Sequence, residues 1–493
     1  QGPPQFCECC PMIDFAKGHP NSSALPRELL AQACDVLSES LKASSEGQIF
    51  GREVLQYGAS EGCHRYRQHL ASFLNRKCPD GWPAFPRALL STNGVSHGLE
   101  LVSSVLTSPG DRVVVESPCY FLASDIFRQH HLEVLPLPST GGEGFSVSAF
   151  DEFVRDQALC PSAKPIRFLY LVPSHCNPSS HSLSNEDRTA LVAAAQRHGI
   201  LVIADEVYHL LDWGRQDDPK NGNMGNPPRR MVAFDPAFRF ASEAHRQHGM
   251  SLGQGSGPLT HQMTPGDEDT ETPNPCVISI SSFTKIFAPG LRLGWIEAAP
   301  PLIDKLAGSG YITSGGGVAP IQEALVQVLL QPMAEGAVEG LCSAGDFALD
   351  SHIARLNSEY EAKSALLANM VNSKGIGIAR RPSGGYFLWV KLPDGVNSQH
   401  LLPVANELGV SFLPGSRCHA TGVSLVPVDT AAEEGARAVA TRSSSTLEVD
   451  DAVALDGWIR LCFAWLSSEE ISAGTTLLAE AIQRVASRDS PGN

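Results

Sequence analysis

The first half of the chain alternates short apolar runs with amphipathic segments. Runs rich in β-branched residues predict strands at 88–92, 112–116, 132–137, 166–172, 201–204 and 276–281. Between them, apolar residues recur at helical spacing and predict helices at 97–106, 123–130 and 186–198. Short apolar strands separated by helices are typical of a mostly parallel sheet sandwiched by helices. We therefore expect an α/β fold here.

The pattern changes beyond about residue 306. Long helical patterns at 321–330 and 347–371 lead into a strand at 384–392. Further strands near 410–413 and 459–463 precede a last helix at 468–485. This order predicts a smaller α+β C-terminal domain. The expected division is an N-terminal arm at 1–46, a large domain at 47–305 and the small domain at 306–493.

Two stretches interrupt this rhythm. Residues 213–275 are rich in Gly, Pro, Asp, Asn and His, with an apolar island at 231–240. Residues 422–450 are rich in Ala, Thr, Ser and Glu. Such compositions are typical of loops and disordered segments. We interpret both stretches as surface insertions and expect the first to be partly disordered.

Composition and charge narrow the class of partner. The chain has 493 residues, with 53 acidic and 37 basic side chains, so its formal net charge is −16. Nucleic acids and anionic membranes call for basic patches, so neither is expected as a partner. No apolar run reaches the length of a membrane span. Cys7, Cys9 and Cys10 lack a second pair at zinc-ligand spacing, which favours free thiols and a cytoplasmic location.

Lys285 lies just beyond one of the predicted strands, in the segment SSFTKIFAPGLRLGW. Pro289-Gly290 turns the chain after it and brings Arg292 round on the far side. In α/β proteins, the carboxyl ends of parallel strands carry the chemistry. The segment is either a surface loop with two solvated cations or a lysine nucleophile beside a fixed cation.

Three polar residues follow other predicted strands. Asp205 ends the strand LVIAD, and Tyr208 lies three residues further on. Asn177-Pro178 follows the strand IRFLYLV. The carboxyl ends of parallel strands meet at one edge, so these side chains are expected near Lys285. The alternatives are a helix N-cap for Asp205 and a plain turn for Asn177-Pro178.

Gly94 to Gly98 read G-x-S-x-G between a predicted strand and a predicted helix. This pattern matches the nucleophile elbow of α/β-hydrolases, with Ser96 as nucleophile. A hydrolase also needs a histidine at a later strand end, and His261 lies in the low-complexity stretch. The other interpretation is a helix N-terminus whose free N–H groups bind a phosphate.

Arg460 interrupts the apolar strand WIRLCFAW. A buried arginine requires an anion, and its planar fork suits a carboxylate. The candidates are a substrate carboxylate and an internal salt bridge.

Together these residues match the needs of pyridoxal phosphate. A lysine that forms a Schiff base, with an aspartate partner for the pyridinium nitrogen, is the signature of this cofactor. Ionised Asp205 keeps the ring nitrogen protonated, which lets the ring accept electrons from a substrate carbanion. Arg292 binds the phosphate, and its charge helps keep Lys285 nucleophilic.

The motifs also resemble the class I/II aminotransferases of the fold-type I pyridoxal phosphate enzymes. The resemblance runs from about Asp14 to the last helix. It rests on the lysine segment, DEVY, the Asn-Pro pair, SGGYFLWV and IRLCFA, all in the family's order. Ser314 to Gly317 (SGGG) resembles a dimer-interface loop of the aminoadipate and kynurenine transaminase branch. The third and fourth residues of the family's Asn-Pro-Thr-Gly are both serine here.

The resemblance implies a role for each matching residue. Lys285 holds the cofactor and moves a proton between the substrate Cα and the cofactor C4′, Asp205 pairs with the ring nitrogen, and Arg460 binds the substrate carboxylate. Asn177 and Tyr208 bond the phenolic oxygen of the ring, and Tyr120 stacks on the ring. The implied phosphate ligands are Gly94, Val95, Ser96, Ser282 and Arg292. Tyr57 is implied to reach the phosphate of the neighbouring subunit of a homodimer.

The expected reaction is transfer of an amino group between an amino acid, with a larger or aromatic side chain favoured, and a 2-oxo acid such as 2-oxoglutarate. Elimination, replacement and cyclisation of S-adenosylmethionine are alternatives, because they share the same carbanion. The fold also serves as an effector-sensing domain in transcription regulators. Those carry a basic winged-helix module in front, whereas the N-terminal segment here is short and the chain acidic.

Overall fold

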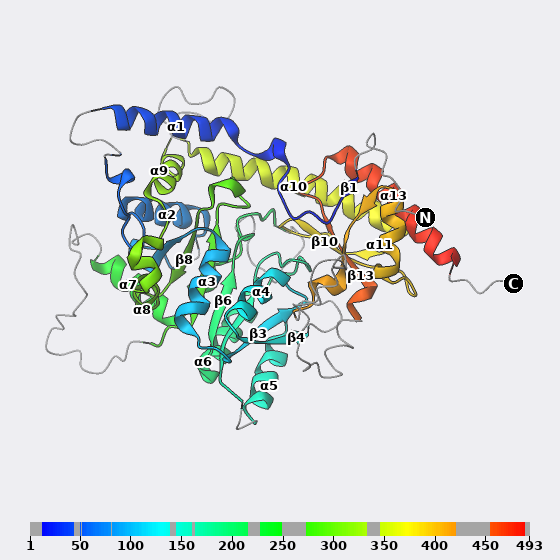
Figure 1. Cartoon of the computed structure of the whole chain (residues 1–493), viewed down its shortest axis with the longest axis horizontal. Coiled ribbons are helices and arrows are strands. Elements are labelled where there is room, and N and C mark those ends of the chain that lie inside the picture. Colours follow the sequence, from blue (N-terminus) through cyan, green and yellow to red (C-terminus); the bar gives the residue numbers. More distant parts are fainter. Residues whose placement is uncertain are drawn as a thin grey trace, which may run out of the picture.

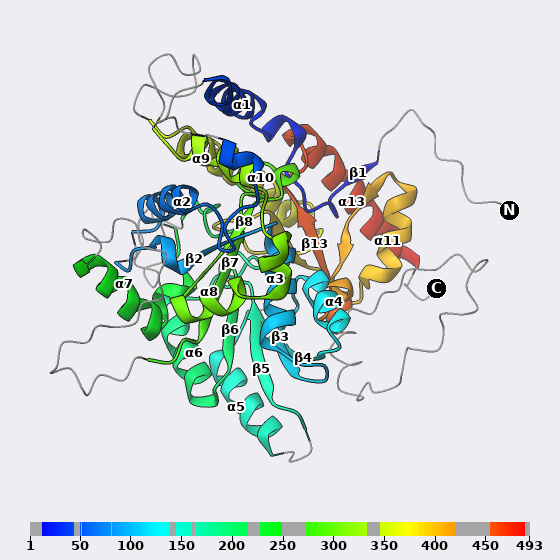
Figure 2. The ribbon, with the colours of Figure 1, turned by 60° about the vertical axis from the view of Figure 1, so that its left-hand side comes forward.

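The computed structural model describes residues 12–43, 50, 52–79, 81–138, 144–159, 163–214, 227–248, 273–332, 346–420 and 454–488. The expectations for Cys7, Cys9, Cys10, His261 and the 422–450 stretch lie outside these residues. Figures 1 and 2 show a large sheet flanked by helices, beside a smaller unit with its own sheet. Within the described residues, no helix is both long and apolar enough to cross a bilayer.

The central sheet has seven strands in the order β2-β8-β7-β6-β5-β3-β4. Six run parallel, and β8 is antiparallel to both of its neighbours. The strands are β2 (Leu89–Thr92), β3 (Arg112–Ser117), β4 (Glu133–Pro138), β5 (Ile166–Leu171), β6 (Leu201–Asp205), β7 (Val277–Ser282) and β8 (Gly294–Ala298). The mostly parallel sheet predicted from the sequence is therefore confirmed.

Helices cover both faces of this sheet, because alternate strand residues point to opposite sides. Ile203 and Ile278 belong to the core with α3 (Val95–Leu106) and α4 (Phe121–Gln129). Val202 and Val277 belong to the core with α5 (Val147–Ala158) and α6 (Asn185–His198). The strands are thus apolar on both faces, which explains their continuous apolar runs.

Other helices pack around the large sheet and link it to the small unit. These helices are α1 (Arg27–Lys42), α2 (His64–Lys77), α7 (Pro236–His248), α8 (Pro300–Ala307), α9 (Pro320–Leu329) and α10 (Ala348–Ser373). Helix α9 contacts α1 and α2. Segments that precede and follow the strands of the large sheet in the sequence therefore meet there (Figure 1).

The apolar island at 231–240 corrects one prediction. We expected a surface insertion, but Met231, Val232 and Phe238 are fully buried. The segment forms a 3₁₀ turn (Met231–Phe234) followed by α7, and it packs into the core shared with α5 and α6. Its apolar side chains are large enough to extend the core, whereas the flanking composition is that of a loop.

The small unit is built on an antiparallel sheet in the order β12-β13-β10-β9. Its strands are β9 (Ile378–Ala379), β10 (Phe387–Lys391), β12 (Leu413–Pro414) and β13 (Trp458–Cys462). Helices α11 (Ser398–Glu407) and α13 (Ser468–Arg488) pack against each other, and α10 packs on α13. The predicted α+β character of this region is confirmed, although the predicted strand at 410–413 is divided between two sheets.

The start of the described chain joins the small unit. Strand β1 (Ile13–Asp14) pairs in parallel with β11 (Val410–Ser411), and β1 lies beside the small unit in Figures 1 and 2. Residues 15–21 then run along the strand that carries Arg460, with Cys462 N–H donating to the carbonyl of Phe15 (2.9 Å). Residues 13–21 of the N-terminal arm are therefore an integral part of the structure beside β13.

Candidate active site

The parallel topology gathers the predicted site residues at one edge of the large sheet. The carboxyl ends of β2, β3, β5, β6 and β7 all open there, facing β10 and β13 of the small unit. A pocket of about 380 Å³ lies between them. Among the predicted site residues, the pocket is lined by Val95, Ser96, Tyr120, Asn177, Asp205, Tyr208, Ser282, Lys285, Arg292 and Arg460.

Lys285 projects from the segment that follows β7. Its Nζ donates a hydrogen bond to the carbonyl of Gly18 (2.7 Å) and lies over the ring of Tyr386, 5.2 Å from the centroid. Burial lowers its pKa to about 8, and the positive charge of Arg460 acts in the same direction. More of this amine is therefore neutral near pH 7 than of an ordinary lysine, as a nucleophile requires.

Asp205 ends β6 and is buried at the floor of the pocket. The hydroxyl of Tyr170 donates to its Oδ2 (3.0 Å), and the N–H of Val207 donates to its Oδ1 (3.3 Å). Burial raises the pKa of this carboxyl to about 6. A cationic ring nitrogen would favour the ionised carboxylate. The sequence analysis did not identify Tyr170, although it lies beside Ile203 of β6 in the register of the sheet.

Arg460 points from β13 of the small unit into the pocket and is 5% exposed. It donates to Oδ1 of Asn177 (2.9 Å) and to the carbonyl of Ala16 (2.5 Å), and its Nε has no hydrogen-bond partner within the described structure. The guanidinium stacks over Phe387, 4.2 Å from the ring centroid. The internal salt bridge is thus contradicted for the described residues, since both partners are neutral oxygens. A substrate carboxylate could replace them.

The turn after β2 forms an anion-binding corner. Gly94 has φ 86°, and a Cβ there would lie 2.9 Å from Nη2 of Arg292, so glycine is required. Val95 and Ser96 begin α3, whose first N–H groups lack partners within the helix. Arg292 donates to the carbonyl of Asn93 (3.2 Å) across this turn. These donors meet at one corner and fit a phosphate.

The hydrolase interpretation of Ser96 gains no support from this geometry. In the described structure, His97 uses its Nδ1 to accept from the N–H of Asn93 (2.9 Å), and it makes no hydrogen bond to Ser96. Ser96 begins a helix whose N–H groups face the same corner as Arg292. The glycine-rich turn is therefore better explained by anion binding than by a nucleophile elbow.

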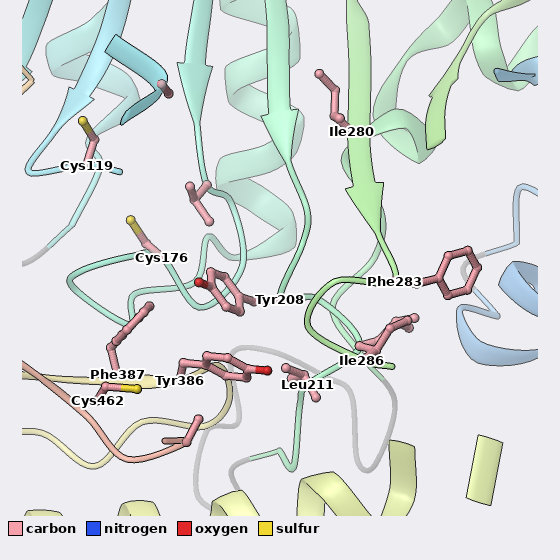
Figure 3. Packing of buried hydrophobic residues seen from close by; sticks show 14 of the residues in the cluster. Cys119, Cys176, Tyr208, Leu211, Ile280, Phe283, Ile286, Tyr386, Phe387 and Cys462 are labelled. Atoms are coloured by element: carbon pink, nitrogen blue, oxygen red, sulfur yellow. The ribbon is translucent and has the colours of Figure 1, made fainter. Parts of the chain in front are cut away.

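Aromatic rings from both sides of the pocket lie next to Lys285. Tyr208 and Tyr386 face each other at 5.4 Å between centroids, next to Phe387 (Figure 3). The hydroxyl of Tyr386 donates to the backbone carbonyl of Lys285 (2.8 Å). Tyr386 lies within the SGGYFLWV motif, but its contact with the lysine segment was not predicted.

The Asn-Pro-Ser-Ser turn is formed despite its departure from the family pattern. Ser180 adopts φ 57°, a conformation that glycine takes more easily. Its N–H donates to the carbonyl of Cys176 (2.7 Å), and its hydroxyl donates to the carbonyl of Phe387 (2.5 Å). These bonds hold the turn and leave Asn177 facing Arg460.

Tyr57 does not line the pocket of its own chain. Its side chain is 87% exposed, and its ring lies beside Gly315, where an added Cβ would approach it to 3.1 Å. The tyrosine and the Ser314 to Gly317 loop thus form one exposed surface.

The sequence analysis also missed the residues that cross the pocket from the N-terminal side. Ala16, Lys17, Gly18 and His19 all line it. Two of their contacts with Arg460 and Lys285 use backbone carbonyls. Every residue has such a carbonyl, so the sequence carried no signal for these bonds.

Comparison with known proteins agrees with this site. The family model described as aminotransferase class I and II matches residues 28–475. The chain is similar to aromatic-amino-acid aminotransferase 1 of Thermococcus litoralis (25% identity, covering 83% of this chain and 81% of that protein). It is also similar to 2-aminoadipate transaminase of Thermus thermophilus (26% identity, 83% of each).

Solved structures show the same fold. A crystal structure of Pyrococcus horikoshii kynurenine aminotransferase, in complex with PMP, matches with a TM-score of 0.68 and 21% identity, covering 97% of this chain and 92% of that one. The family match extends over most of the chain, from α1 into α13. The chain therefore belongs to the class I and II aminotransferases and is a pyridoxal phosphate-dependent enzyme.

Proposed function

We propose that this enzyme transfers an amino group between an amino acid with a large or aromatic side chain and a 2-oxo acid, with Lys285 as its catalytic lysine. The observation that carries the proposal is the convergence of Lys285, Asp205 and Arg460 in one pocket. The lysine has a lowered pKa, the carboxyl is buried, and the guanidinium has no anionic partner in the described structure.

The residues fit pyridoxal phosphate. When bound, the cofactor supplies a ring that accepts electrons from the substrate Cα. Asp205 would keep a proton on the ring nitrogen, Asn177 and Tyr208 would bond the phenolic oxygen, and Tyr120 would cover the ring. The phosphate is held by Gly94, Val95, Ser96, Ser282 and Arg292, of which all but Gly94 line the pocket.

The chain's own groups then direct the reaction. Arg460 binds the substrate α-carboxylate bidentately, which fixes the orientation of Cα. The amine of Lys285 would take up and give back the proton at the substrate Cα. Its lowered pKa favours this exchange because the neutral amine is accessible near neutral pH.

The rim of the pocket supports a large substrate side chain. Phe121, Leu122, Phe387 and Leu413 line the pocket, and Leu122 is 45% exposed. An apolar wall gains free energy when it covers an apolar or aromatic side chain. Related proteins are named for aromatic amino acids, 2-aminoadipate and kynurenine. We favour 2-oxoglutarate as the acceptor.

The proposal includes a homodimer in which Tyr57 reaches the phosphate of the neighbouring subunit. Its support is an 87% exposed tyrosine beside the Ser314 to Gly317 loop, outside its own pocket. We also propose a reducing, cytoplasmic location, which suits the eight free cysteines of the described residues.

An absorption spectrum of the cofactor-saturated protein tests the proposal. We expect a visible band that borohydride removes and that is lost in Lys285→Ala. A donor amino acid should convert the band to that of the pyridoxamine form, and 2-oxoglutarate should restore it. Turnover of amino acids without the pyridoxamine form would favour elimination or replacement instead. Cofactor-saturated protein with no band would overturn the role of Lys285.

A further inference from the structure

The segment that crosses the pocket, residues 16–19, is held at both ends. On one side, β1 pairs with β11, and Cys462 N–H donates to the carbonyl of Phe15 (2.9 Å). On the other side, Asn21 donates from its N–H to the carbonyl of Ala464 (3.1 Å) and from its side chain to the carbonyl of Trp465 (2.6 Å). The backbone of this short segment therefore has a defined position at the pocket.

Lys17 occupies the centre of this segment. The carbonyl of Ala16 accepts from Arg460, and the carbonyl of Gly18 accepts from Lys285. Consecutive Cα atoms are about 3.8 Å apart, so the backbone of Lys17 lies between the contacts to these two cations. A substrate that reacts at Lys285 with its carboxylate on Arg460 would therefore place its side chain within reach of this wall.

Among the charged residues that line the pocket, Lys17 is given no role by the proposed function. The lining residues include four cations, Lys17, Lys285, Arg292 and Arg460, and one carboxylate, Asp205. Lys285, Arg292 and Arg460 serve the cofactor and the α-carboxylate in the proposed function. Lys17 makes no ion pair with a described carboxylate, and its Nζ lies 4.8 Å from the centroid of the Trp465 ring.

The neighbouring histidine does not share this role. Burial lowers the pKa of His19, and the charges of Lys285 and Lys17 lower it further. His19 is therefore mostly neutral near pH 7. Lys17 is the remaining cation of the wall, with a flexible stem that lets its ammonium move from the indole to an incoming anion.

We infer that Lys17 is a specificity-determining residue that binds the distal carboxylate of a dicarboxylic substrate. This inference rests on the proposed function. A 2-oxo acid or amino acid with a second carboxylate pairs that group with Lys17 while its α-carboxylate occupies Arg460. A neutral side chain packs on Phe121, Leu122 and Leu413 instead, without help from Lys17.

Steady-state kinetics of Lys17→Gln test this inference with one amino donor and two acceptors. The acceptors are 2-oxoglutarate and 2-oxopentanoate, which have the same carbon number but differ in the terminal carboxylate. We expect kcat/KM for 2-oxoglutarate to fall about fivefold, the value of an ion pair of about 1 kcal/mol, and that for 2-oxopentanoate to stay unchanged. Lys17→Arg should keep the preference, and Lys391→Gln, an exposed lysine on β10, is the matched control.

Equal losses for both acceptors would reduce Lys17 to a structural role and overturn the inference, as would no loss for either. Calorimetric titration of the holoenzyme with glutarate and pentanoate gives a second readout without turnover. Glutarate should bind more tightly than pentanoate to the wild-type protein, and Lys17→Gln should remove that preference; an unchanged preference contradicts the inference. A wild-type protein that converts no 2-oxo acid would contradict the proposed function instead, and the glutarate preference would still report on Lys17.

Discussion

Asp205 and Glu206 are neighbours at the end of β6, but they face two different regions. Buried charges meet opposite charges in one region and not in the other. Asp205 faces the pocket, where its bonds come from a hydroxyl and a backbone N–H. Glu206 faces residues 230–238, which comprise the buried 3₁₀ turn and the start of α7 and are called the docked segment below. Its Oε1 accepts from the N–H of Met231 (2.8 Å) and lies 3.9 Å from Arg188. In the same region, Arg230 pairs with Glu297 at 2.5 Å, and both side chains are 1% exposed.

The two regions differ in what their buried charges do: around residues 230–238 they stabilise the fold, and in the pocket they serve function. In the docked region, opposite charges meet and connect the segment to β6 and β8. In the pocket, Arg460 and Lys285 donate to neutral carbonyl and amide oxygens, while Asp205 lies buried with a raised pKa. Buried charges without counter-charges cost free energy that a ligand of opposite charge can return. The pocket is thus suited to bind anionic groups and a cationic ring nitrogen.

The largest effect is expected from a substitution that removes the amine of Lys285. Lys285→Ala should lower kcat by about 10⁴-fold, since it abolishes proton transfer at Cα. Its folding should be unimpaired, because the amine is held by one backbone carbonyl. Initial rates and urea unfolding of the same preparation check both statements. A variant that loses activity only in proportion to its unfolding would contradict this separation.

Glu297→Leu should have the opposite profile. Breaking a buried pair by removing one partner costs about 3–5 kcal/mol, because Arg230 loses a carboxylate partner while it stays buried. Urea unfolding measures the loss, and kcat of the remaining folded enzyme should stay near the wild-type value. The double variant Glu297→Leu, Arg230→Leu should recover part of the stability. No recovery would show that Arg230 acts mainly through its bond to the carbonyl of Trp82.

The pair Asp205→Asn and Glu206→Gln tests the comparison at two consecutive residues. The folded pKa of Asp205, about 6, lies above its ordinary value of 3.8. As pH rises from about 4 to 6 the unfolded chain ionises first, so Asp205 lowers the stability of the cofactor-free protein across this window. Asp205→Asn should remove this fall and stabilise the cofactor-free protein by about 1–3 kcal/mol above pH 6.

Glu206→Gln should instead weaken the docked region and destabilise the protein by about 1–3 kcal/mol. Urea unfolding at pH 4.5 and 7.5 distinguishes the two variants. Their activities should rank in the reverse order, with Asp205→Asn the more damaged. If both variants destabilise the cofactor-free protein equally, the proposed difference between the two regions is wrong.

The smallest effect concerns the pH dependence of cofactor attachment. Burial lowers the pKa of Lys285 to about 8, and only the neutral amine is nucleophilic. The rate at which cofactor-free protein gains the visible band should rise with pH and level off above about 8. Between pH 8 and 7 it should fall about fivefold, following the neutral fraction of the amine. A rate that still rises steeply at pH 9.5 would indicate an ordinary lysine.

Much of the site could be predicted from the sequence because parallel strands bring their ends together. Lys285 and Asn177 follow different strands, Asp205 ends a third one, and one topology places all three at one edge. Arg460 was recognisable because a guanidinium in an apolar strand requires a partner.

Other features could not be predicted because their cause lies far away in the chain. Strand β8 carries the buried Glu297 next to its last residue, and this glutamate pairs with Arg230, which lies 67 residues earlier in the chain. The apolar island at 231–240 looked like a loop because of its neighbours. The bonds of Ala16 and Gly18 use carbonyl groups, which no residue type identifies.

The pairing of β1 with β11, and of residues 15–21 with the strand that carries Arg460, has a consequence for biosynthesis. The ribosome delivers the first strand long before its partners exist. The large sheet has its seven strands by residue 298, yet the pocket wall formed by residues 16–19 gains its anchors on β11 and β13 only more than a hundred residues later. During translation, the nascent enzyme is therefore expected to assemble its large sheet first and to gain the pocket wall of residues 16–19 only near the end.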